Sequence, residues 1–153
     1  FLMKYTTQTI INLPREEVIH KLDNPDNMKH WQRGLIAYTI LNETPGKEGA
    51  KMQLDYKMGK REMSLTETIL KNDFPKAFHA SYDTKGVHNV QKNYFEIVEE
   101  NKTRWRSESE FQFAGFGMKL MAFFMPGMFK KQSLKYLNDF KNFAENGVSV
   151  SNK

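Results

Sequence analysis

The chain has 153 residues, of which 39% are hydrophobic and 27% charged, with a formal charge of +5 and no cysteine. A chain of this length fits one domain and can form a core without metal or disulfide support, so a wholly disordered protein and a disulfide scaffold are both excluded. The N-terminal residues turn polar after Met3 and so offer no apolar signal-peptide core. Together with the lack of cysteine, this favours a cytoplasmic location.

The first elements predicted along the chain are a strand and two short helices. Residues 4–13 alternate and are rich in Thr and Ile, which predicts a strand. Pro14 suits the first position of a helix whose apolar face would contain Val18, Ile19 and Leu22. The sequence DNPDN at residues 23–27 then ends this helix and starts a second one, with Asn24 as its cap.

The middle of the chain follows the two-residue period of antiparallel strands. Short breaks rich in Gly, Pro, Asn and Lys separate the segments and suit hairpin turns. The predicted strands cover residues 35–42, 51–58, 61–71, 77–84, 88–99 and 103–113. Six strands joined in this way make an antiparallel meander.

The last part of the chain is helical and starts with a segment rich in methionine and phenylalanine. Residues 116–132 contain four Met and four Phe, but Lys119 interrupts them and Lys130 and Lys131 end them, which excludes a membrane span. Pro126 predicts either a kinked long helix or a short helix joined to a long one. The long helix is indicated by Leu134, Leu137, Phe140 and Ala144, with Gly147 at its end and a frayed tail over residues 148–153.

This order of elements, together with the sequence INLPREEVIHKLDNPDNMKHW at residues 11–31, resembles the START-like superfamily, also called SRPBCC. That superfamily includes polyketide cyclases and the birch pollen allergen. The resemblance covers about residues 4–146 and implies an α+β helix-grip fold. In that fold a curved, seven-stranded antiparallel sheet surrounds a long C-terminal helix, and two short helices follow the first strand. The resemblance also implies one ligand-binding domain over residues 1–147, with an apolar cavity between the sheet and the helix.

The alternation within the predicted strands separates an inward face from an outward face. In residues 103–113 the charged side chains take the even positions, so Ser107 and Ser109 share the inward face with aromatic residues. Two inward serines leave volume that is either a cavity or is filled by aromatic side chains from the helix. The candidate ligand-binding residues are Trp31, Tyr38, Met52, Leu54, Tyr56, Leu65, Glu67, Trp105, Ser107, Ser109, Phe111, Met121, Met125 and Phe129.

Glu67 interrupts an otherwise apolar inward face, and burial of a carboxylate is costly unless it is paired. It is a weak candidate for holding the polar end of a ligand, or for acting as an acid/base, alone or with His79 or His88. The alternatives are a bulge at this position and an ion pair with Arg104 or Arg106.

Three neutral amides, Asn89, Gln91 and Asn93, share the inward parity of Phe95. Two interpretations are open: they line the polar end of a cavity, or the sheet curls and they lie at its exposed rim.

Two functions fit the predicted fold and its candidate site residues. The preferred one is binding, and possible transport, of a small hydrophobic or lipid-like ligand. The alternative is a cyclase- or dehydratase-like enzyme that acts on an aromatic or polyketide-type substrate through Glu67.

The histidine spacing and the missing nucleotide motifs predict neither a metal nor a cofactor. The basic charge comes without a Lys/Arg run or a nucleic-acid motif, so no nucleic-acid partner is expected. The oligomeric state is left open.

Residues 116–129 are predicted to form the entrance of the pocket, because unbranched Met side chains adapt to changing surfaces and Pro126 weakens the backbone. The alternative is an ordinary core segment with a proline kink. Lys119, Lys130 and Lys131 would favour transient contact with an anionic membrane surface.

Overall fold

The computed structural model describes residues 2–151, apart from the side chain of Pro126. It contains one seven-stranded sheet in which every neighbouring pair of strands is antiparallel, with strand order β1-β7-β6-β5-β4-β3-β2. The strands are β1 (Leu2–Ile11), β2 (Leu35–Ile40), β3 (Lys51–Met58), β4 (Arg61–Asp73), β5 (Ala77–Thr84), β6 (Val87–Glu99) and β7 (Lys102–Phe113). The predicted meander is therefore confirmed, and the N-terminal strand closes it by pairing with β7.

Two short helices follow β1, as predicted. Helix α1 (Arg15–Leu22) buries Val18 and Ile19. Asn24 then caps the 3-10 turn η1 (Pro25–Asn27), because its side chain accepts a hydrogen bond from the backbone N–H of Asp26. The turn continues into α2 (Met28–Trp31), which carries Trp31 into the core.

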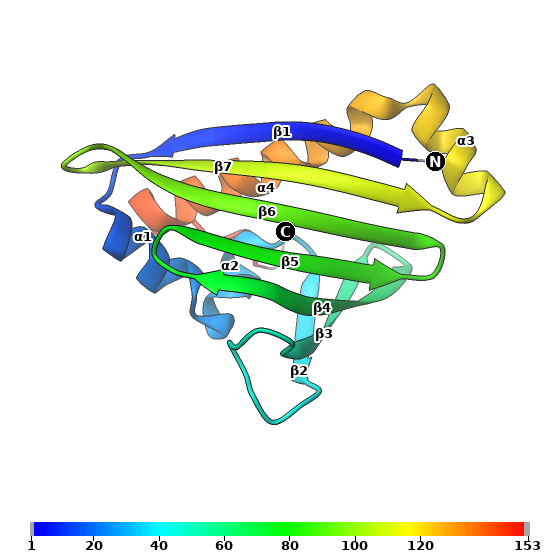
Figure 1. Cartoon of the computed structure of the whole chain (residues 1–153), viewed down its shortest axis with the longest axis horizontal. Coiled ribbons are helices and arrows are strands. Elements are labelled where there is room, and N and C mark those ends of the chain that lie inside the picture. Colours follow the sequence, from blue (N-terminus) through cyan, green and yellow to red (C-terminus); the bar gives the residue numbers. More distant parts are fainter. Residues whose placement is uncertain (1, 152–153) are drawn as a thin grey trace.

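The C-terminal part forms two helices rather than one kinked helix. Helix α3 (Phe116–Phe124) ends at Met125, whose backbone leaves the helical region, and α4 (Pro126–Asn146) begins at the next residue. A left-handed Gly147 ends α4, as the sequence predicted. Figure 1 shows α4 crossing behind the sheet, from α3 at one end to α1 and α2 at the other.

Helix α4 is attached to the edge strand β1. The Lys141 ammonium group donates to the carbonyl oxygen of Ile10, and the Tyr5 hydroxyl lies 2.6 Å from the Ser133 hydroxyl. The Tyr5 hydroxyl also donates to the carbonyl oxygen of Phe129, at 3.1 Å. The long helix therefore lies along one side of the concave face, and it reaches the middle of the sheet through large side chains.

The C-terminal tail differs from the prediction in its described part. Val150 is buried, and its backbone N–H donates to the carbonyl oxygen of His30. The Ser149 hydroxyl lies 2.9 Å from Nδ1 of the same histidine. These contacts hold residues 149–150 against α2, whereas residues 152–153 lie outside the described part of the chain.

Candidate functional site

The concave face of the sheet places one row of side chains across five strands. The strand registers set Met52 opposite Glu67, Glu67 opposite Tyr82, Tyr82 opposite Asn89, and Asn89 opposite Phe111. Because facing residues of antiparallel strands project to the same side, this row points toward α4.

One half of the concave face is closed by aromatic packing. The rings of Trp31 and Trp105 each meet Phe140 edge-on, with centroids 5.3 Å apart, and the two tryptophans lie 6.1 Å from each other. The Trp105 indole donates to the Asn93 side-chain oxygen at 3.0 Å. Close packing of this kind makes Trp31 and Trp105 core residues, although the sequence proposed them as ligand contacts.

The other half of the concave face is less completely buried. Met52, Leu65, Glu67, Tyr82 and Phe111 point inward, yet each keeps part of its surface accessible to solvent. We call these five residues the concave site. Inward side chains that remain partly exposed mark a face that the helices do not fully cover, and an apolar face with a few polar groups is the usual composition of a ligand site.

Glu67 is the only carboxylate of the concave site. Burial raises the pKa of Glu67, and a hydrogen bond from the Tyr82 hydroxyl acts in the opposite direction. Burial also raises the pKa of Tyr82 well above its usual value, with the charge of Glu67 as a further cause. At neutral pH the phenol is therefore a hydrogen-bond donor, next to a carboxyl group that holds its proton more tightly than usual.

Two further phenols stand beside this pair. Burial raises the pKa of Tyr56, and the proximity of Tyr136 and of Glu67 adds to the effect. Burial likewise raises the pKa of Tyr136, which α4 carries over the sheet. We call Tyr56, Glu67, Tyr82 and Tyr136 the acid–phenol cluster; it places one carboxyl and three hydroxyl groups from β3, β4, β5 and α4 close together.

Comparison with known proteins adds information on the fold. No protein-family model matches the chain, and no curated protein sequence matches it. Solved structures do match. Ara h 8.0201 superposes with a TM-score of 0.73 at 8% identity, over 94% of this chain and 98% of that chain. The Zhui aromatase/cyclase from Streptomyces sp. R1128 superposes with a TM-score of 0.77 at 12% identity, over 95% of this chain and 94% of that chain.

A third match, truncated norcoclaurine synthase from Thalictrum flavum, has a TM-score of 0.71 at 9% identity and covers 95% of both chains. All three structures share a curved antiparallel sheet with a long C-terminal helix. The chain has the helix-grip fold. At these identities the likeness concerns the fold, so the chemistry has to be argued from the residues of this chain.

Within this helix-grip chain, the two inward serines are buried beside β1 and α4. Ser107 and Ser109 are only 5% and 3% exposed. Tyr5 lies opposite Ser109 and Thr7 opposite Ser107 on β1, the strand that α4 covers. The small side chains thus make room for Tyr5 and the helix, which favours the alternative of a filled volume; that they border a ligand cavity stays a prediction.

The neutral amides lie inside. Asn89 and Asn93 are buried, so the alternative of an exposed rim is wrong. Asn89 donates to the carbonyl oxygen of Glu110, and Gln91 donates to the Asn89 side-chain oxygen at 2.9 Å. Asn89 joins the concave row beside Tyr82, and Asn93 orients Trp105.

The remaining predicted ligand contacts are spread around the fold. Leu54 is fully buried, and Tyr38 on β2 donates to the Asp26 carboxylate at 2.7 Å. Phe129 packs on Phe111, with ring centroids 5.2 Å apart. Met121 is half-buried, whereas Met125 is 53% exposed at the junction of α3 and α4.

The proposed partners of Glu67 lie elsewhere. His88 contacts Asp83, and His79 stacks edge-on with Tyr94, one position out of phase with the inward residues of β5. Arg106 pairs with Glu96 and Glu108, and Arg104 lies 4.0 Å from Glu96. Both the His–Glu pair and the Arg–Glu pair are therefore wrong, and Tyr82 takes their place.

Sequence reasoning missed Tyr82 and Tyr136. The two-residue period of residues 77–84 puts Phe78, Ala80 and Tyr82 on one face, so Tyr82 could have been found by the test that found Glu67. Tyr136 gives no such signal, because its place depends on how α4 lies over the sheet.

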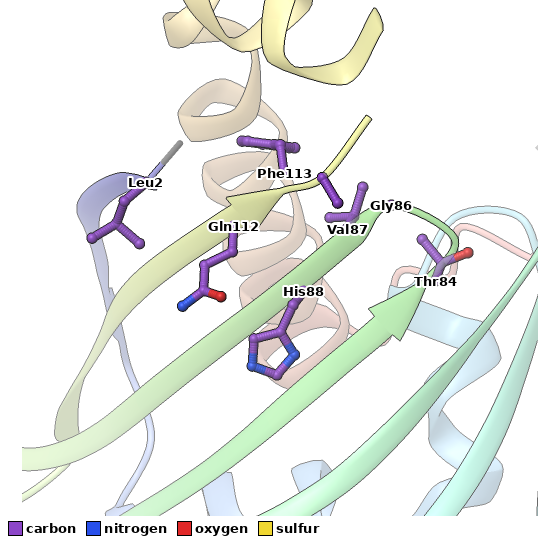
Figure 2. Close-up of a pocket in the computed structure, with 8 residues that line it drawn as sticks. Leu2, Thr84, Gly86, Val87, His88, Gln112 and Phe113 are labelled. Atoms are coloured by element: carbon purple, nitrogen blue, oxygen red, sulfur yellow. The ribbon is translucent and has the colours of Figure 1, made fainter. Parts of the chain in front are cut away.

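The surface also has two open hollows. One of about 530 Å³ lies at the ends of β5, β6 and β7, between Leu2, Val87 and Phe113 (Figure 2). A second, of about 360 Å³, includes Lys4, Lys92 and Glu110 on the outer face of the sheet. Neither hollow includes a residue of the concave site.

Two further observations concern metals and membranes. Among the described residues, no group of three or more His, Cys, Asp or Glu side chains could hold a metal ion. No described helix has the length and apolar character needed to cross a bilayer.

Proposed function

We propose that this helix-grip chain binds a small, largely hydrophobic molecule at the concave site. The observation that carries the proposal is the set of inward but partly exposed side chains Met52, Leu65, Tyr82 and Phe111 around one carboxyl group, Glu67. Apolar side chains that keep water contact inside a fold favour replacement of that water by an apolar ligand.

The polar groups of the site specify the kind of ligand. The Tyr82 hydroxyl and a Glu67 carboxyl group with a raised pKa suit a molecule with one or two polar groups, such as a phenol or a carbonyl compound. A similar fold accommodates such ligands elsewhere: norcoclaurine synthase, at 10% identity, has been solved in complex with dopamine and hydroxybenzaldehyde. This supports an aromatic, mainly apolar ligand with polar substituents.

Titration with an apolar fluorescent dye tests the binding function. Saturation at one site per chain is expected. Leu65→Asp should weaken binding at least about tenfold, since a charge at the site would have to be desolvated. Leu70→Asp is the matched control, because Leu70 lies on the same strand and is exposed. Equal binding by both variants would contradict the concave site.

The second candidate function is a cyclase- or dehydratase-like enzyme. It is favoured by the raised pKa of Glu67, since a carboxyl group that titrates closer to neutral pH is a better proton-transfer group. One of the similar folds is an aromatase/cyclase, at 12% identity.

Turnover of an aromatic polyketide-type substrate by Glu67→Gln tests the enzyme function. A loss of about 10²–10⁴ in kcat is expected for a lost acid/base group. Glu62→Gln, at an exposed position of the same strand, should keep full activity. An unchanged rate in Glu67→Gln would leave binding as the function.

A further inference from the structure

Helix α3 has its more apolar face turned toward solvent. Phe116 is 80% exposed, and Phe123 and Phe124 are each 69% exposed. Leu120, one turn from Phe116 and Phe123, is exposed as well. The side facing the protein carries only Met118, Met121 and the buried Ala122. Surface helices normally have the opposite arrangement, so this face is expected to meet an apolar partner.

The position of α3 leaves this face free to make contact. In Figure 1 the helix stands at one end of the sheet, beyond the ends of the strands. The rings of Phe123 and Phe124 contact each other, with centroids 5.1 Å apart. The four apolar residues Phe116, Leu120, Phe123 and Phe124 form a continuous patch, which we call the α3 face.

The charges on the segment of chain that contains the α3 face have a single sign. No acidic residue occurs between Glu110 and Asp139. The same interval contains four lysines, all exposed: Lys119, Lys130, Lys131 and Lys135. A short apolar helix face flanked by lysines is typical of helices that lie in the interface of an anionic bilayer.

We propose that the α3 face docks on the surface of a membrane containing anionic lipids. Phe116, Leu120, Phe123 and Phe124 enter the boundary between headgroups and acyl chains, and the lysines contact the lipid phosphates. A second copy of the chain is a poorer partner for this face. In a two-fold dimer each patch meets itself, which brings Lys119 and its neighbours toward their own copies. The proposal does not depend on the concave site.

Cosedimentation of the full chain with vesicles tests the proposal. Phosphatidylcholine vesicles containing phosphatidylglycerol are expected to bind the protein, and vesicles of phosphatidylcholine alone much less. Added salt should weaken the binding, because it screens the lysines. Phe123→Ser/Phe124→Ser should lower the partition coefficient about tenfold or more, since both rings lose their burial in lipid.

Ile36→Ser/Ile97→Ser is the matched control, because both isoleucines are exposed and lie far from α3 in sequence. This control should bind like the wild type. Equal binding by the two double variants, or no binding of the wild type to anionic vesicles, would overturn the proposal.

A concentration-dependent dimer that Phe123→Ser/Phe124→Ser abolishes would also overturn the proposal. Dye titration of the same variant separates this result from the proposed ligand function. The phenylalanine variant should bind the dye at the concave site with unchanged affinity.

Discussion

At the scale of single residues, Glu67 combines two properties that do not usually occur together. It is surrounded by protein on the concave face, and it keeps part of its surface open to solvent. Its hydrogen-bond partner Tyr82 cannot neutralise a negative charge, so the penalty for ionisation stays in the folded protein. That penalty can be measured as a dependence of stability on pH.

We expect Glu67→Gln to stabilise the protein at neutral pH. The folded-state pKa of Glu67 is raised, so this group contributes stability below the ordinary carboxyl pKa of about 4.3, and the contribution is lost as the pH rises through the raised value. Glutamine does not titrate and keeps an acceptor for Tyr82. In urea at pH 7 the variant should therefore have a larger free energy of unfolding than the wild type, by at most about 1.4 kcal/mol for each unit by which the pKa is raised. This difference should shrink toward pH 4. An equal difference at both pH values would contradict the raised pKa.

At the scale of elements, α3 and α4 differ in what holds them. Helix α4 contacts β1 through Tyr5 and Lys141 and buries Leu137 and Phe140. Helix α3 has nine residues and only one fully buried side chain, Ala122. A helix this short is marginal without tertiary packing.

Amide hydrogen exchange is expected to be faster in residues 116–124 than in residues 134–143, because local opening of α3 exposes little apolar surface. Anionic vesicles should slow the exchange in α3 and leave α4 unchanged. Equal protection of the two helices in the free protein would contradict this difference.

The close approach of β1 and α4 to β7 sets a second expectation. Ser107→Leu and Ser109→Leu should each lower the free energy of unfolding by about 1–3 kcal/mol, since both serines are buried and face β1. Gln112→Leu, at an exposed position of the same strand, should stay within about 0.5 kcal/mol of the wild type. Unchanged stability of both serine variants in urea would contradict this expectation and indicate free volume beside the serines.

At the scale of the whole molecule, the fold was more predictable than the site. Alternation and hairpin breaks are local signals, and they located every strand of the meander and the cap at Asn24. The path of α4 along β1 depends on contacts between residues more than 120 positions apart, such as Tyr5 and Ser133. That path decides whether Ser109 and Trp105 are buried in the core, and it brings Tyr136 near Tyr56. These features could therefore not be deduced from periodicity.

The packed half of the concave face should account for much of the stability. Phe140 is fully buried between Trp31 and Trp105, and Phe140→Ala is expected to cost about 3–5 kcal/mol. The free energy of unfolding of a domain is only about 5–15 kcal/mol, so this variant should unfold at a far lower urea concentration than the wild type. Phe123→Ala, at an exposed position, should change stability little. Similar urea midpoints of unfolding for the Phe140→Ala and Phe123→Ala variants would show that Phe140 is not central to the core.

The position of β1 at the edge beside β7 has a consequence for biosynthesis. Strands β2 to β7 can pair in the order in which they leave the ribosome, because each lies next to its successor. Strand β1 leaves before its partners β7 and α4, and Ser133 follows Tyr5 by 128 positions. At roughly 5–20 residues per second, β1 therefore stays unpaired for about 6–26 seconds, and the sheet is completed only after β7 and α4 have been made.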